Sequence, residues 1–335
     1  MIETPELAPV QRTSFHALAT DVLHVLYQHR VMSTDQLQRL LIPAALDATY
    51  LRRQLRLLHA AGLVERIWAN YQPRSVEVAS DRRRRPNKMP YLWFLTDEGA
   101  ESVEQGAELQ PRPYRVTLES VAGARQLHTL AVNETGLAFA RHAARLGHEC
   151  GPLDWMPEVA HRIRDGQRRF EDDHVITDAV VNYVHVRRGQ RTMLTLFVEL
   201  DRATMTTARL AAKVAAYGRL HEYVPQHPDR ARRSAASTRP AWQYTYPVFP
   251  RLLVVLDGKP SPSLGSRLAA RTEDLYTLTR ADPRLARLAG RLSIGVTTLQ
   301  LLRERGPFEP IFTPLLRGTP ENRPPLTDLY LKTAQ

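Results

Sequence analysis

The sequence predicts an α+β fold in two parts, a small helical N-terminal part and a larger C-terminal part in which helices and strands alternate. The length of 335 residues suits two domains at ~150 residues each. The spacing of apolar residues changes along the chain from the period of helices to the period of strands. The single cysteine, Cys150, excludes an intrachain disulfide or a cysteine-rich zinc cluster. We therefore expect a fold held together by apolar cores.

The charge of the chain points to a polyanionic partner. The net charge is +11, and only four of the 46 basic residues are lysines. Basic side chains that contact phosphates release counterions, so nucleic acid is the first partner to consider. A general preference for arginine would spread the charge evenly, yet residues 49–95 hold ten basic and three acidic side chains, whereas the rest of the first 110 residues is net acidic. The excess is a patch, which favours double-stranded DNA as the partner.

The chain shows no sign of a membrane or an export signal. Its first ten residues are acidic and lack an apolar stretch, and no run approaches the ~18 apolar residues of a membrane span. We expect a soluble, cytoplasmic protein.

Three helices are predicted before the first strand. An amphipathic helix spans residues 17–28. Ser33 and Gln36 form a capping signal for a short second helix that ends at Leu41. A third helix spans residues 47–61 and ends at Gly62, where a left-handed cap is expected.

The third helix and the segment after it predict a DNA-binding surface. Three leucines form its apolar stripe, and polar side chains fan over the opposite face. A strand at 63–69, a polar segment and a strand at 90–95 follow, which completes a winged helix-turn-helix within residues 1–110. The alternatives are a solvated helix face and a mobile charged loop. The predicted DNA-binding residues are Thr49, Arg52, Arg53 and Arg56 on the helix and Arg82, Arg83, Arg84, Arg85 and Lys88 on the wing.

The C-terminal part is predicted to alternate between helices and strands. A long helix covers residues 120–146, and a tail that begins at Pro307 is expected to wrap the surface. This gives a domain over residues 120–310 and a Pro-rich tail over 311–335. The elements after the first helix are strands at 155–163, 175–186 and 192–200, a helix at 204–223, a strand at 251–256, a helix at 264–278 and a strand at 292–298. The order αβββαβ is that of the restriction-endonuclease-like fold.

Acidic residues interrupt two of these apolar strands. Alternation along residues 192–201 places Glu199 and Asp201 on one face. Asp178 lies inside the preceding strand, where a charge is costly unless it has a partner or a function. Carboxylates that converge on Mg²⁺ or Mn²⁺ are what metal-dependent phosphodiester cleavage requires. Simple ion pairs with arginines are the alternative interpretation of all three acids.

This pattern resembles the PD-(D/E)XK nuclease superfamily. By that resemblance Asp178 and Glu199 ligate the metal, and Asp201 stands where the superfamily has a lysine. Lys213 on the next helix is the replacement lysine, and Tyr217 follows it in a Lys-x-x-x-Tyr arrangement. His128, on the first helix, is a further metal ligand by the same resemblance; Glu158 is a weaker candidate. Packing and solvated roles are the alternatives for Lys213, Tyr217 and His128.

Six segments taken together resemble the replication-relaxation family of bacterial plasmid and integrative-element proteins. The resemblance covers residues 20–225 and is most specific in FVELDRAT; the segments are LTDEGA, LHTLAVNE, W-x-x-E, TDAVV, FVELDRAT and KVAAY. It implies a DNA-binding protein involved in replication, relaxation or mobilisation.

Two functions stay open at this point. One is a metal-dependent DNA endonuclease that nicks the bound DNA. The other is a non-catalytic accessory factor or transcriptional regulator whose second domain keeps the nuclease shape. Replication or conjugation proteins are expected partners, and a homodimer is open because single winged helices often pair, although the sequence shows no heptad repeat.

Overall fold

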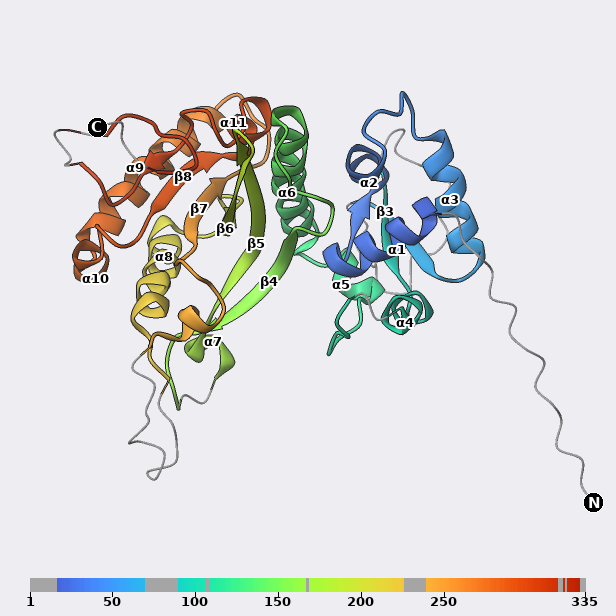
Figure 1. The fold of residues 1–335 in the computed structure, drawn as a ribbon, viewed down its shortest axis with the longest axis horizontal. Helices are drawn as coiled ribbons and strands as arrows, with labels where there is room; N and C mark the ends of the chain where they lie inside the picture. Colours follow the sequence, from blue (N-terminus) through green and yellow to red (C-terminus); the bar gives the residue numbers. More distant parts are fainter. Residues whose placement is uncertain are drawn as a thin grey trace, which may run out of the picture.

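The computed structural model describes residues 17–69, 90–106, 109–166, 169–225, 239–318, 322 and 324–331. These residues form two β-sheets with helices packed on them, so the chain is a mixed α+β protein (Figure 1). The N-terminal sheet has the strand order β1-β3-β2, and the larger C-terminal sheet has the order β4-β5-β6-β7-β8-β9.

The N-terminal part begins with the three helices predicted from the sequence. They are α1 (Ala17–His29), α2 (Thr34–Leu41) and α3 (Thr49–Ala60). The capping box of α2 is confirmed, because the Ser33 hydroxyl accepts a hydrogen bond from the Gln36 backbone and the Gln36 side chain accepts one from Ser33. Gly62 ends the third helix with a φ of 75°, as a left-handed cap requires.

A small antiparallel sheet packs beside these helices; its first strand lies between α1 and α2 in the chain, and the other two follow α3. Its strands are β1 (Met32–Ser33), β2 (Val64–Trp68) and β3 (Tyr91–Leu95), and α4 (Asp97–Gln105) starts at the Thr96 cap. The candidate wing residues Arg82, Arg83, Arg84, Arg85 and Lys88 lie outside the described residues.

The predicted long helix at 120–146 is two helices. The helices α5 (Leu118–Ala122) and α6 (Gln126–Leu146) are separated at Gly123, whose backbone is extended. The first packs under the N-terminal sheet, where Val121 and Ala122 contact Leu92 and Phe94 of β3 through one apolar cluster. The apolar pattern runs without interruption through both helices, although α5 packs on the N-terminal sheet and α6 packs on the C-terminal sheet.

The C-terminal sheet is part antiparallel and part parallel. β4, β5 and β6 form an antiparallel meander, β7 and β8 run parallel to β6, and β9 closes the far edge. The strands and helices are β4 (Trp155–Arg162), α7 (Phe170–Asp173), β5 (His174–Arg187), β6 (Gln190–Asp201), α8 (Thr207–Glu222), the 3-10 helix η3 (Ala241–Tyr244), β7 (Arg251–Leu256), α9 (Leu264–Ala281), α10 (Pro283–Arg287), β8 (Ile294–Thr298), α11 (Leu299–Glu304) and β9 (Thr313–Pro314).

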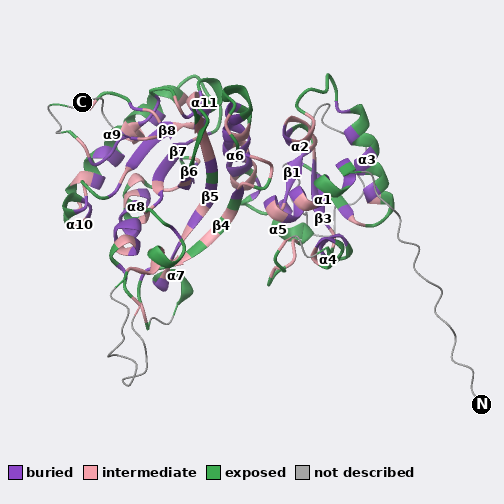
Figure 2. Ribbon diagram, in the orientation of Figure 1, coloured by how far each residue is buried: buried purple, intermediate pink, exposed green. Residues whose placement is uncertain are grey.

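Helices cover both faces of this sheet, and the sheet between them is mostly buried (Figure 2). α6 and α11 pack with Leu196, Val198 and Leu200 of β6. α8 and α9 pack on the other face with Phe197. This alternation in β6 agrees with the predicted period of two.

The two parts of the molecule share one apolar core. Leucines of α1 and α3 belong to the same buried cluster as Phe139 of α6. His29 stacks on Trp155 at 4.1 Å between ring centroids, and its Nε2 lies 2.7 Å from the Pro152 carbonyl oxygen. Gly136 leaves room for the same tryptophan, since a Cβ there would lie 2.3 Å from the Trp155 ring. The junction is therefore packed like an interior.

The prediction that the chain beyond Pro307 wraps the surface is wrong. Phe312, Leu315 and Leu329 are fully buried, and β9 pairs with β8. The prolines of this segment suggested a surface position, but the apolar residues between them complete the core. A membrane-spanning helix is not found in the part of the chain that the structure describes.

Candidate functional site

Two strands of the antiparallel meander, β5 and β6, separate at Asp178. The ladder between β5 and β6 ends at the pair Ala179 and Val198. Beyond it, the Leu200 backbone N–H donates to Asp178 Oδ2 at 2.7 Å, so a side chain takes the place of a strand partner. The neighbouring strand β4 is irregular at the same level, where Glu158 has a φ of 52° between the pairs made by Pro157 and Val159. The pairing of β5 with β6 therefore ends beside Asp178, and the side chains described next gather at this break.

A lysine from α8 lies between two carboxylates at this gap. Lys213 Nζ is 3.1 Å from Asp178 Oδ1 and also pairs with Glu199 Oε2. One turn later on the same helix, the Tyr217 hydroxyl donates a hydrogen bond to Glu199 Oε1. We call Asp178, Glu199, Lys213 and Tyr217 the acid cluster. The sequence-based expectation that Lys213 and Tyr217 point back at the acids of the strands matches this geometry.

The acid cluster has a closed inner side and an accessible outer side. The Glu199 side chain is 1% exposed and Tyr217 is fully buried, whereas Asp178 is 13% and Lys213 is 28% exposed. Because its hydroxyl is buried and bonded to Glu199, Tyr217 lies in no position to attack DNA. It instead fixes the orientation of the glutamate.

The environment separates the pKa values of the two carboxyl groups. Complete burial and the neighbouring Asp178 raise the pKa of Glu199 well above its usual range, against the attraction of Lys213. Burial also opposes ionisation of Asp178, yet hydrogen bonding to His128 and the charge of Lys213 outweigh it and lower the pKa to about 2. Burial lowers the pKa of Lys213, but both acids raise it more, so the ammonium stays charged. One carboxylate is thus firmly ionised beside a second that holds its proton more tightly.

His128 lies at the accessible side of the acid cluster. It comes from the first turn of α6, and its Nε2 is 3.4 Å from Asp178 Oδ1. Its side chain is one-third exposed. The structure therefore brings together five of the residues predicted from the sequence: Asp178, Glu199, Lys213, Tyr217 and His128.

Asp201 is not part of the acid cluster. Its carboxylate pairs with Arg271 of α9, and Arg271 also donates to the Met205 carbonyl oxygen at 2.7 Å. Asp201 shares a strand face with Glu199, as predicted, but it lies at the last position of β6, where α9 supplies a different partner. No feature of the sequence identified Arg271, because the pair depends on how α9 packs.

Glu158 contacts the N-terminal part instead of the acid cluster. Its carboxylate pairs with Arg30, which follows α1, and lies 4.0 Å from Arg125 at the start of α6. The Arg30 guanidinium also donates to the Tyr114 hydroxyl at 2.9 Å. The irregular strand beside Asp178 is thus tied to the N-terminal part.

The donor set of the acid cluster is small for a metal site. Within the described ranges no group of three or more His, Cys, Asp or Glu side chains is arranged to hold a metal ion. Mg²⁺, however, is usually held by one or two carboxylates together with water and substrate phosphates. Asp178 and Glu199, which already surround one cationic atom, fit that requirement.

The exposed face of α3 carries the other predicted site. Leu51, Leu55 and Leu58 are fully buried, which fixes the rotation of the helix. The solvent side of the helix presents the four predicted residues Thr49, Arg52, Arg53 and Arg56, together with the exposed side chains of Tyr50 and Leu57. The helix therefore offers three guanidinium groups to solvent.

Comparison with known proteins identifies the family. Neither curated proteins nor solved structures yield a match. A family model described as replication-relaxation matches residues 23–232, which is more than half of the chain and includes α3 and the acid cluster. The match agrees with the resemblance of the six sequence segments, and it suggests a role in the replication or relaxation of plasmids or mobile elements. This chain belongs to the replication-relaxation family.

Proposed function

We propose that this protein binds double-stranded DNA through α3 and nicks it at the acid cluster during the replication or mobilisation of a plasmid or other mobile element. The order of α1, α2, α3 and the small sheet supports a winged helix-turn-helix. The order α6, β4, β5, β6, α8 and β7 supports a restriction-endonuclease-like domain.

One observation carries the proposal of cleavage. Two carboxylates from adjacent strands and an ammonium group from the next helix meet where the strands separate. An acidic pair of this kind suits a divalent cation, and a lysine suits the negative charge that develops on phosphorus. A cluster that served only to hold the sheet together would not need a break in the strand pairing.

The residues of the cluster have distinct roles in this proposal. Asp178 and Glu199 would hold Mg²⁺ or Mn²⁺, which would supply an activated water and neutralise charge on the scissile phosphate. Lys213 donates to the phosphate oxygen in the transition state. Tyr217 orients Glu199, and His128 orients Asp178.

A second candidate function is a non-catalytic DNA-binding factor. It is favoured by the bonding of the cluster, because each carboxylate oxygen of Asp178 and Glu199 already has a partner within the chain. In this alternative Lys213 is a permanent substitute for the metal ion.

The two functions are separated by nicking of supercoiled plasmid in the presence of Mg²⁺ or Mn²⁺. We expect open-circular product from the wild type and initial rates lowered at least ~100-fold by Asp178→Asn and by Glu199→Gln, because each variant removes a charge that stabilises the transition state by several kcal/mol. Glu222→Gln on α8 is the matched control; its carboxylate lies near Arg284, outside the acid cluster.

Equal inactivity of all four proteins would support the non-catalytic factor. Nicking that continues at an unchanged rate in EDTA would contradict the metal-dependent mechanism.

A further inference from the structure

A pocket of about 600 Å³ lies outside the acid cluster, between α6, α11 and the end of β7. Three arginines line it: Arg141 and Arg145 from α6, and Arg303 from α11. Its two acidic side chains are Asp257, directly after β7, and Glu304. The pocket opens to solvent, so a ligand can enter it without a change in the fold.

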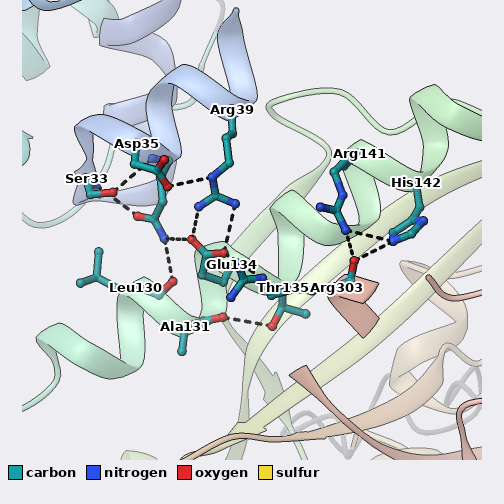
Figure 3. Close-up of polar contacts among 11 residues, drawn as sticks. Ser33, Asp35, Arg39, Leu130, Ala131, Glu134, Thr135, Arg141, His142 and Arg303 are labelled. Atoms are coloured by element: carbon teal, nitrogen blue, oxygen red, sulfur yellow. Dashed lines mark hydrogen bonds and ion pairs between the residues drawn. The ribbon is translucent and has the colours of Figure 1, made fainter. Parts of the chain in front are cut away.

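The acids of the pocket are already engaged, and two of its arginines are not. Asp257 lies 3.6 Å from Arg202, and Glu304 accepts a hydrogen bond of 2.9 Å from Gln300. Neither Arg141 nor Arg145 has an ion-pair partner among the residues that the structure describes. Arg141 instead donates to the backbone carbonyl of Arg303 (Figure 3). The pocket thus holds guanidinium groups that lack a counter-charge.

The arginines also repel one another. Burial lowers the pKa of Arg141, and the charges of Arg145, Arg303 and Arg39 lower it further. An anion placed among these groups would relieve the repulsion and satisfy their N–H donors. The planar, forked donors of arginine match the oxygens of a phosphate group better than a point charge does.

Ion pairs beside the pocket connect it to the N-terminal part. Arg39 of α2 reaches across the junction to Glu134 of α6, and Arg303 lies 3.7 Å from the same carboxylate (Figure 3). Because Glu134 also accepts a hydrogen bond of 2.9 Å from Gln36, it holds α2 beside the pocket. α2 packs against both α3 and α6, so it lies between the helix with the exposed arginines and the helix that supplies Arg141 and Arg145.

We propose that this arginine pocket binds backbone phosphates of the duplex that α3 holds. The proposal rests on the proposed DNA binding and adds a second anchoring point on the C-terminal part. The open shape and the spread of guanidinium groups over two helices suit a strand of phosphates, which contacts positions along a surface. The contact would be independent of base sequence and sensitive to salt.

The test compares two double variants in the full-length chain. Arg145→Gln/Arg303→Gln removes two charges from the pocket. Arg287→Gln/Arg291→Gln removes two exposed charges near α10, where neither residue lines the pocket. Binding of a fluorescent 30-bp duplex is measured between 50 and 200 mM NaCl. We expect the pocket variant to bind at least ~10-fold more weakly and its slope of log K against log salt to fall by about 1.8, because each lost phosphate contact removes about 0.9.

Thermal shift with inorganic pyrophosphate and with ATP tests a free phosphate compound as the occupant. Stabilisation of the wild type but not of the pocket variant, with equal DNA affinity of the two, would overturn the proposal in favour of a small ligand. Equal affinity and slope of the two double variants would also overturn it, and DNA binding through α3 would still stand if the wild type binds the duplex. Failure of the wild type to bind any duplex would reject both proposals.

Discussion

The acid cluster and the exposed arginines differ in whether each charge has a partner inside the molecule. Lys213 forms ion pairs with both Asp178 and Glu199, and the remaining oxygen of each carboxylate accepts a hydrogen bond. Arg52, Arg53 and Arg56 of α3, like Arg145 of the pocket, point to solvent. Charged side chains therefore neutralise one another in the acid cluster, whereas the exposed arginines present their charge to solvent. A cluster that is satisfied internally can be opened only by a competitor, whereas arginines with no ion-pair partner among the described residues are available to an external anion.

The largest expected effect on stability comes from removing the cation of the acid cluster. Lys213→Met keeps the aliphatic stem and leaves Glu199 buried beside Asp178 without a neutralising charge. Breaking a buried ion pair in this way should lower the free energy of unfolding by about 3 kcal/mol. Denaturant titration at pH 7 measures it.

Arg209→Met on the same helix is the control, since that exposed side chain should contribute less than about 0.5 kcal/mol. A loss below 1 kcal/mol for Lys213→Met would show that water reaches the carboxylates and that the cluster is not closed.

A smaller effect is expected from acid at the junction of the two parts. Burial lowers the pKa of His29 to about 3 from an ordinary value of 6.5. As the pH falls below 6.5, the unfolded chain binds this proton before the folded chain does, so stability is present above pH 6.5 and is lost toward pH 3. Each pH unit within that window should cost about 1.4 kcal/mol, which is about 2 kcal/mol between pH 6.5 and 5.

His29→Phe keeps the stack on Trp155 and removes the titration. Its free energy of unfolding should vary less between pH 8 and 5 than that of the wild type, even though its value at pH 8 is lower through the lost bond to Pro152. Parallel pH curves for the two proteins would refute a buried neutral imidazole.

The smallest effect on stability, and a large one on recognition, is expected from α3. Arg52→Gln and Arg56→Gln should change the free energy of unfolding by no more than about 0.5 kcal/mol, because both side chains are exposed. If they read base edges, each should alter preference at one base pair by about 1–3 kcal/mol. Competition binding with a library of duplexes measures the preference; weakened binding with no change of preference would assign these arginines to the backbone.

Local signals accounted for most of what the sequence predicted correctly. Ser33 and Gln36 determine the start of α2 through contacts three residues apart, and the period of two assigns Glu199 and Asp201 to one face of β6. Neither property depends on distant parts of the chain. The placement of Lys213 and Tyr217 came from the resemblance, which supplied the long-range relation that periodicity lacks.

The errors arose where a distant partner decides the structure. The apolar pattern through Gly123 looked like one helix, yet the two halves pack on different sheets. The prolines after Pro307 suggested a surface tail, yet Phe312 and Leu329 fill the core. Arg271 lies 70 residues from Asp201 in the chain, so no local pattern could connect them.

One buried cluster of side chains extends from Leu18 of α1 through Phe139 of α6 to Leu329 near the C-terminus. Within the described residues, this cluster joins the interior of the N-terminal part to that of the C-terminal part. Heating should therefore produce a single calorimetric transition whose van't Hoff and calorimetric enthalpies agree. The N-terminal part expressed alone would expose an apolar surface that is normally covered, and it would aggregate where the intact chain stays dispersed. If recombination exchanged one part with that of a relative, the new part would have to pack against the buried side chains of the old one. The two parts are therefore expected to be inherited together.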